Sequence, residues 1–179
     1  MRAVVRAAVA SYLGAQSIPF LGTIHTARPF LIPEDDYDSQ ISNWALQLNP
    51  PVGDNRSGCV MIIHIPDSQR SRVSLSGRAF IEDTDVHTVV LEMLFANQSG
   101  DGEIAQGEHD ILMDATVMAI RADPLLGMPG TIWSAGEFQQ GVHVTQHEPF
   151  WSQDGLTEFI VALIRFDTWE WLSGPAGTT

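Results

Sequence analysis

The chain has 179 residues, which fits one domain able to bury about 70% of its unfolded surface. Hydrophobic residues make up 44% and charged residues 17%, a composition that excludes a disordered chain. It carries 22 acidic residues against nine arginines and no lysine, for a net charge of −13. This balance argues against proteins that grip nucleic acid through its phosphates.

The single cysteine and the uneven distribution of charge exclude further classes of protein. The single Cys59 excludes an internal disulfide and a four-cysteine zinc site, so it is expected to be a small buried hydrophobe. Residues 1–72 are neutral, whereas residues 73–179 hold three arginines and 16 acids. No run of 18 apolar residues occurs, and Arg2 and Arg6 interrupt the N-terminal stretch. The chain is therefore expected to be soluble, without a membrane span or a signal segment.

The N-terminal part predicts one helix and one long loop. Residues 1–13 are expected to be helical, because Val5, Val9 and Leu13 recur at helical spacing, and Gly14 follows them. Residues 29–58 contain four of the ten prolines and an acidic run. Loops of this length inside a compact domain are commonly functional or are ordered by a partner. The candidate partner-contacting residues of this loop are Phe30, Tyr37 and Trp44.

Strand patterns begin at Cys59. Apolar or alternating runs predict strands at 60–65, 73–76 and 88–95, and the acids Glu82, Asp83 and Asp85 are assigned to a turn between strands. Residues 96–107 are expected to be a glycine-rich acidic loop. Residues 110–122 are expected to be a second helix that ends before Pro124.

Three further strands are predicted at 131–135, 142–146 and 157–166, followed by a flexible tail at 173–179. The order is therefore one helix, several strands, a second helix and several strands. This order predicts a single α+β domain over residues 1–172, in which an antiparallel sheet is flanked by two helices on one side.

The second helix is apolar over more than one face. At about 100° per residue, its apolar positions cover an arc of about 220°, whereas packing on one sheet face needs about 100°. The surplus must meet either the first helix of the same chain or a neighbouring subunit. The candidate subunit-interface residues are Ile111, Met113, Met118 and Ile120.

Motifs that carry chemistry are missing from the sequence: it has no phosphate-binding loop, dinucleotide-binding turn, zinc-protease helix or nucleophile elbow. His143 with His147 and Glu148 comes nearest to a metal pattern, but the alternation there favours a strand, on which four residues span about 13 Å. His64 and His109 are interpreted as capping or hydrogen-bonded histidines. No catalytic residue, metal ligand or cofactor is predicted, and the chain is not expected to be an enzyme.

Several short motifs point to one family. Ala27-Arg28-Pro29 is followed by the acidic Glu34-Asp35-Asp36-Tyr37, and the second helix contains Glu108-His109-Asp110-Ile111-Leu112-Met113-Asp114-Ala115 and Ile120-Arg121-Ala122-Asp123-Pro124. Together with the short N-terminal helix, the β meander and the terminal hairpin, these features resemble the tail terminator (tail completion) proteins of long-tailed bacteriophages. The loop at 29–58 makes this chain longer than compact members.

The resemblance implies a structural virion protein without enzymatic activity or cofactor. Such a protein forms a hexameric ring at the head-proximal end of the tail tube, stops tube growth and joins the tail to the head. Its partners would be other copies of itself, the tail tube protein and the head–tail connector protein, with no membrane. Genomic DNA would pass through the ring without tight binding. The protein would be assembled in the host cytoplasm and located in the virion.

Three alternatives stay open. The nearest is a neck (head completion) protein of the same virion, because neck proteins share much of this fold. A second is a small metal-dependent β-sheet enzyme that uses His64, His143 and His147. A third is a monomeric ligand-binding α+β domain, which would have no ring interface.

Overall fold

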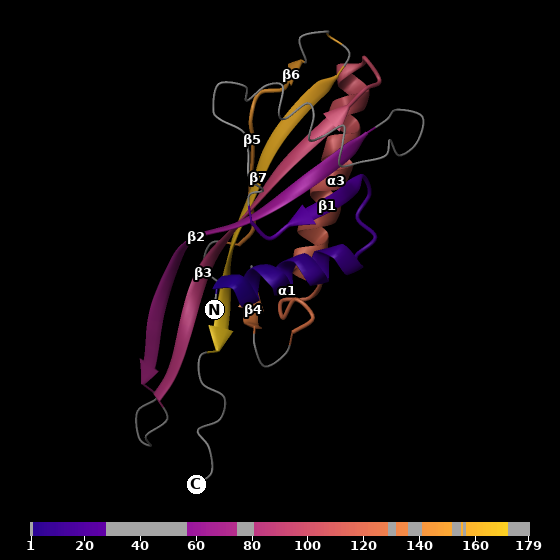
Figure 1. Ribbon diagram of the computed structural model, residues 1–179. Helices are drawn as coiled ribbons and strands as arrows, with labels where there is room; N and C mark the ends of the chain where they lie inside the picture. Colours follow the sequence, from indigo (N-terminus) through magenta and orange to yellow (C-terminus); the bar gives the residue numbers. More distant parts are fainter. Residues whose placement is uncertain are drawn as a thin grey trace.

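The computed structural model describes residues 2–27, 57–74, 81–128, 132–135, 141–151, 155 and 157–171. These residues form one mixed β-sheet and two helices, which belongs to the α+β class predicted from the sequence (Figure 1). The predicted loop residues Phe30, Tyr37 and Trp44 lie outside the described residues, as does the predicted tail.

Four strands follow one another across the sheet in the order β1, β2, β3, β7. β2 pairs antiparallel with β3, and β3 pairs antiparallel with β7. β1 runs parallel to β2, so the prediction of an antiparallel sheet is wrong at this edge. A parallel pair needs a connection of a dozen or more residues, and the long segment between the two strands provides it. The bounds are β1 Leu21–His25, β2 Gly58–Ser74, β3 Ile81–Asn97 and β7 Glu158–Trp171.

Three short strands share the other edge of β7. Residues 168–170 of β7 pair with β4 (Ile132–Ala135), residues 162–165 with β5 (His143–Gln146), and residues 158–159 with β6 (Phe150–Trp151). The last third of the chain therefore completes the sheet along one strand.

One face of the sheet shares its core with both helices, α1 (Arg2–Ala15) and α3 (Gly102–Ala122). Side chains alternate along a strand, so every second residue of β2, β3 and β7 points to this helix face. α1 lies across the sheet and α3 runs along its strands (Figure 1). The sheet residues of this core are Cys59, Met61, Ile63, Ile65, Val89, Leu91, Met93, Phe95, Ile160, Ala162, Ile164 and Phe166.

α3 begins at Gly102 rather than near residue 110, so the prediction of a loop through residue 107 is wrong. Glycine disfavours helix interiors, and Gly102 and Gly107 made this stretch look like a loop. The helix start is stabilised by Asp101, whose Oδ1 accepts hydrogen bonds from the backbone N–H of Glu103 at 2.9 Å and of Ile104 at 3.5 Å. This is an N-cap, which satisfies donors that the first turn leaves unpaired.

The acids Glu82, Asp83 and Asp85 lie in β3, so their assignment to a turn is wrong. The backbone register places Asp83 opposite Arg72 and Asp85 opposite Arg70 of β2. The hairpin therefore continues past the point where the apolar pattern stops.

A polar junction holds α3 against the ends of β2 and β3. The Asn97 side-chain amide donates to Ser57 Oγ at 2.8 Å and to Glu108 Oε2 at 2.9 Å, and Ser57 Oγ donates to the same Glu108 oxygen. Asn97 and Ser57 are buried, and hydrogen bonding of this kind offsets the cost of removing polar groups from water. The junction positions α3 along the sheet.

Candidate functional site

The four predicted interface residues of α3 divide between two environments. Met113 is only 6% exposed and Ile120 is fully buried in the core of the subunit, so neither is available to a neighbouring molecule. Ile111 and Met118 are 53% and 69% exposed. With Ile104, which is 39% exposed, they form a line of apolar residues spaced seven apart.

The helical period explains this division. Seven residues make nearly two turns, so Ile104, Ile111 and Met118 share one direction away from the sheet. Part of the surplus apolar arc meets α1, where Tyr12 donates its hydroxyl to the carbonyl oxygen of Ala119 at 2.8 Å. The remaining apolar residues of the arc, Ile104, Ile111 and Met118, are exposed. The core-facing side of α3 consists of Ala105, His109, Leu112, Met113, Thr116 and Ile120.

One acidic residue, Asp114, lies beside the apolar line. Asp114 is exposed, and no hydrogen bond or ion pair engages it within the described chain. At about 100° per residue, Gly107, Ile111, Asp114 and Met118 fall within an arc of about 60°. A Cβ added at Gly107 would meet nothing within 4 Å, so packing within the subunit does not require a glycine there. These four residues are called the α3 patch below.

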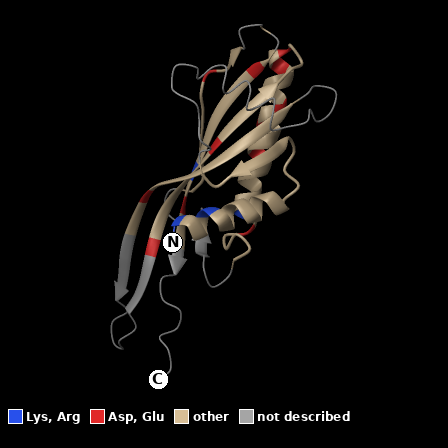
Figure 2. Ribbon diagram, in the orientation of Figure 1, with Lys and Arg blue, Asp and Glu red and all other residues tan. Residues whose placement is uncertain are grey.

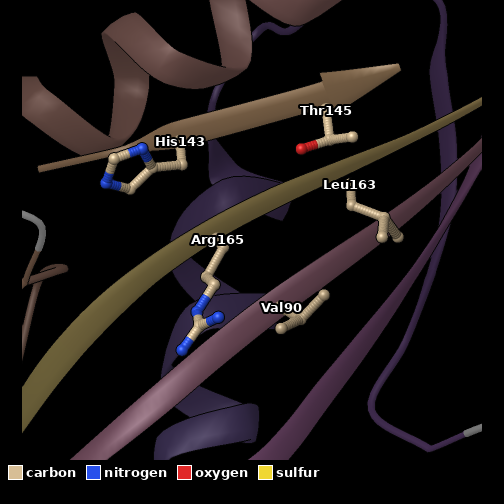
Figure 3. Close-up of a pocket in the computed structure, with 5 residues that line it drawn as sticks. All are labelled: Val90, His143, Thr145, Leu163 and Arg165. Atoms are coloured by element: carbon tan, nitrogen blue, oxygen red, sulfur yellow. The ribbon is translucent and has the colours of Figure 1, made fainter. Parts of the chain in front are cut away.

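A pocket of about 490 Å³ lies on the opposite face of the sheet (Figure 3). The side chains on this second face point away from the helices, because they alternate with the core residues. Cross-strand register brings the lining together, with Val90 opposite Arg165, Arg165 opposite His143, and Leu163 opposite Thr145. The lining residues, called the Arg165 pocket below, are Val90, His143, Thr145, Leu163 and Arg165.

Charge in the Arg165 pocket is dominated by Arg165. Its side chain is exposed, and within the described part of the chain no carboxylate pairs with it. The acids nearby have other partners: Glu92 Oε2 lies 2.7 Å from His64 Nε2, and Asp167 Oδ1 accepts from Thr88 Oγ1 at 3.0 Å. Within the part of the chain that the structure describes, the pocket therefore combines the unpaired Arg165 with the apolar side chains of Val90 and Leu163. The chain has only nine basic residues, and Figure 2 colours those that are described.

The histidines of the metal alternative are not brought together. His64 and His143 occupy the same row of the sheet, but β3 and β7 lie between their strands. Three strand spacings of about 4.8 Å separate them by roughly 14 Å, which is too far for one ion. Among the described residues no group of three or more potential ligands could hold a metal ion.

His109 lies in the interior of α3, so the predicted capping role is wrong, and its Nδ1 lies 3.7 Å from Oδ1 of Asp110. That distance is too long for a hydrogen bond, so neither ring nitrogen has a hydrogen-bond partner among the described residues. The ring meets Phe95 edge-on with centroids 5.7 Å apart. Burial lowers the pKa of the imidazole, and the carboxylate of Asp110 opposes this effect only in part. The uncharged ring acts as an apolar core residue.

Cys59 behaves as predicted. It is fully buried, and burial raises the pKa of its thiol, so it carries no reactive thiolate.

Sequence reasoning missed the Arg165 pocket. Its residues come from three strands, and His143 and Arg165 are far apart in the chain. The alternation in each strand could place a residue on a face, but only the register makes them neighbours.

Neither described helix is long and apolar enough to cross a membrane. A scan against models of known protein families found no match, and no curated protein matches the sequence.

Proposed function

We propose that this chain is a structural virion protein, a tail terminator that assembles into a ring at the head-proximal end of a bacteriophage tail tube. In this proposal the subunit carries both helices over one face of a largely antiparallel sheet and leaves the outer side of α3 for another subunit. The ring stops growth of the tube and joins the tail to the head. The protein acts without catalysis and without a cofactor.

The observation that carries the proposal is the exposed apolar line on α3. Large apolar side chains at 39%, 53% and 69% exposure recur at one spacing on one helix. Single exposed apolar residues are ordinary, whereas an aligned set marks a contact surface. The resemblance of the α3 sequence to tail terminator proteins adds the assembly in which such a surface would be used.

The charge balance supports the same proposal. A net charge of −13 without lysine suits a subunit that surrounds DNA without holding it. A ring with many arginine and lysine contacts to phosphate would resist release of the genome.

The test is the mass and shape of the purified full-length chain. We expect light scattering to give about six subunits and electron micrographs to show closed rings, if necessary with the tail tube protein present. A strict monomer in the presence of the tube protein would exclude the proposal.

Binding to isolated tail tubes separates the tail terminator from the neck protein. A terminator caps one end of the tube and stops its elongation in polymerisation assays. A neck protein leaves elongation unchanged and binds the head–tail connector instead.

A further inference from the structure

We propose that the α3 patch of one copy docks into the Arg165 pocket of a second copy, with Asp114 facing Arg165 across the interface. This inference rests on the proposed ring and names the two surfaces that would build it.

The two surfaces carry opposite charges. Asp114 is an exposed carboxylate and Arg165 an exposed guanidinium, and within the described chain neither has a partner of opposite charge. A carboxylate can accept two parallel hydrogen bonds from a guanidinium, an arrangement that lysine cannot reproduce. The pocket of one copy presents Arg165, and a second copy of this chain, with 22 acidic residues against nine arginines, offers many carboxylates. An acidic residue is therefore the expected occupant of the pocket.

The second argument is the apolar content of both surfaces. Ile111 and Met118 flank Asp114 on the α3 patch, and Val90 and Leu163 form the apolar part of the pocket. The pocket volume of about 490 Å³ lies within the range of about 300–1,000 Å³ that is typical of ligand sites. It has room for a few side chains. Burying these residues together adds a hydrophobic contribution to the ion pair.

Gly107 provides the third argument. A glycine inside a helix is less favourable than an alanine. Within the described part of the subunit no contact requires a glycine at this position. A position without a side chain on the outer side of α3 allows another surface to approach the helix backbone closely. The rim of the Arg165 pocket can therefore approach the α3 backbone closely at Gly107.

The placement of the two surfaces decides the kind of assembly. The α3 patch points away from the helix face of the sheet, whereas the Arg165 pocket lies on the second face. A contact between two unlike patches is heterologous: it repeats head to tail and closes into a ring when the rotation between copies permits. A two-fold dimer would have to make this contact twice in one interface, which two patches on opposite sides of the subunit do not allow.

The experiment uses two full-length variants with opposite charge reversals, Arg165→Glu and Asp114→Arg. Each alone brings like charges together, so we expect the assembly constant measured by sedimentation to fall about tenfold or more. An equimolar mixture should recover assembly, because every contact in an alternating ring then joins opposite charges. Thermal melting of each variant, under conditions in which the wild type is monomeric, must show a folded protein. A loss of assembly then cannot be explained by unfolding.

Gly107→Leu tests the contact with a variant that is not expected to lose stability. Leucine favours the helix, so this variant should be at least as stable as the wild type while its assembly weakens about tenfold or more. Val4→Leu, on the exposed side of α1, should leave assembly unchanged.

The outcomes separate this contact from the ring itself. If the wild type forms rings and the Arg165 and Gly107 variants do so equally well, the contact is wrong and the proposed function stands. Failure of the mixture to recover assembly also overturns the contact. A wild type that stays monomeric with the tube protein overturns both.

Discussion

At the scale of single residues, exposure distinguishes methionines that look alike in the sequence. Met113 and Met118 stand five positions apart on α3, which turns them about 140° away from each other. Met113 is 6% exposed and packs in the core, whereas Met118 is 69% exposed. The same helix therefore carries one methionine in the core and one that is exposed.

Alanine substitutions should separate these roles. Met113→Ala removes buried atoms and leaves a cavity, so we expect it to lower the free energy of unfolding by about 2–5 kcal/mol. Met118→Ala should change it by no more than about 0.5 kcal/mol. Chemical denaturation of the monomer measures both. Equal losses would mean that the phase of α3 is wrong.

His109 predicts a pH dependence. Its buried ring has a lowered pKa, so at mildly acidic pH the unfolded chain binds a proton that the folded chain does not. Stability is then unaffected above the unfolded pKa of about 6.5 and falls as the pH drops below it. We expect His109→Phe to weaken this dependence between about pH 7.5 and pH 5.5, as measured by thermal melting. The exposed His147→Gln serves as the control and should keep the wild-type slope.

At the scale of elements, the start of α3 shows how one polar side chain overrides weak helix propensity. Two glycines stand in the first two turns, yet the helix begins at Gly102. The carboxylate of Asp101 accepts backbone hydrogen bonds there, and Glu108 is held by Ser57 and Asn97. The early start brings Ile104 onto the exposed apolar line.

Removal of the cap should destabilise this element. Asp101→Ala is expected to lower the free energy of unfolding by about 0.5–2 kcal/mol, because the first-turn donors lose their acceptor. Asp101→Asn keeps an acceptor while removing the charge, so it should cost much less. Urea titration checks both variants. A loss of equal size in both would assign the effect to charge rather than to capping.

Glu158 depends on the same charge. Burial, and secondly the negative charge of Asp101, raise the pKa of the Glu158 carboxyl. Asp101→Ala and Asp101→Asn both remove that charge, so its effect on Glu158 is the same in both variants. The difference between their free energies of unfolding, measured at one neutral pH, therefore reports on capping.

At the scale of the whole molecule, net charge predicts weak interaction with DNA. The chain has nine arginines against 22 acids. Among the residues that Figure 2 colours, basic positions are seen on α1. Affinity for duplex DNA grows with each arginine or lysine that displaces a counterion. If the chain forms the proposed ring, its net negative charge would disfavour tight binding of DNA.

A gel-shift titration at about 50 mM salt, where electrostatic binding is strong, should show no complex in the micromolar range. The acidic balance of the chain is the reason, and the same titration with a basic DNA-binding protein is the control. Micromolar binding that weakens steeply as salt is raised would overturn the passive role.

Several features were determined by the sequence itself. Apolar periodicity and alternation indicated both helices, the central strands and the α+β class, because burial of one face imposes the period of each element. The burial of Cys59 followed from its chemistry. Among the four predicted interface residues, the sequence did not separate Ile111 and Met118, which are exposed, from the buried Met113 and Ile120.

Other features were decided only by the tertiary structure. The parallel pairing of β1, the extension of β3 through Glu82 and Asp83, and the burial of His109 depend on partners distant in sequence. The Arg165 pocket depends on the register of β3, β7 and β5, and a shift of one residue would move each lining side chain to the other face. The hydrophobic pattern of one element shows which of its faces is buried. A site made by several strands depends also on the register between them, which that pattern does not contain.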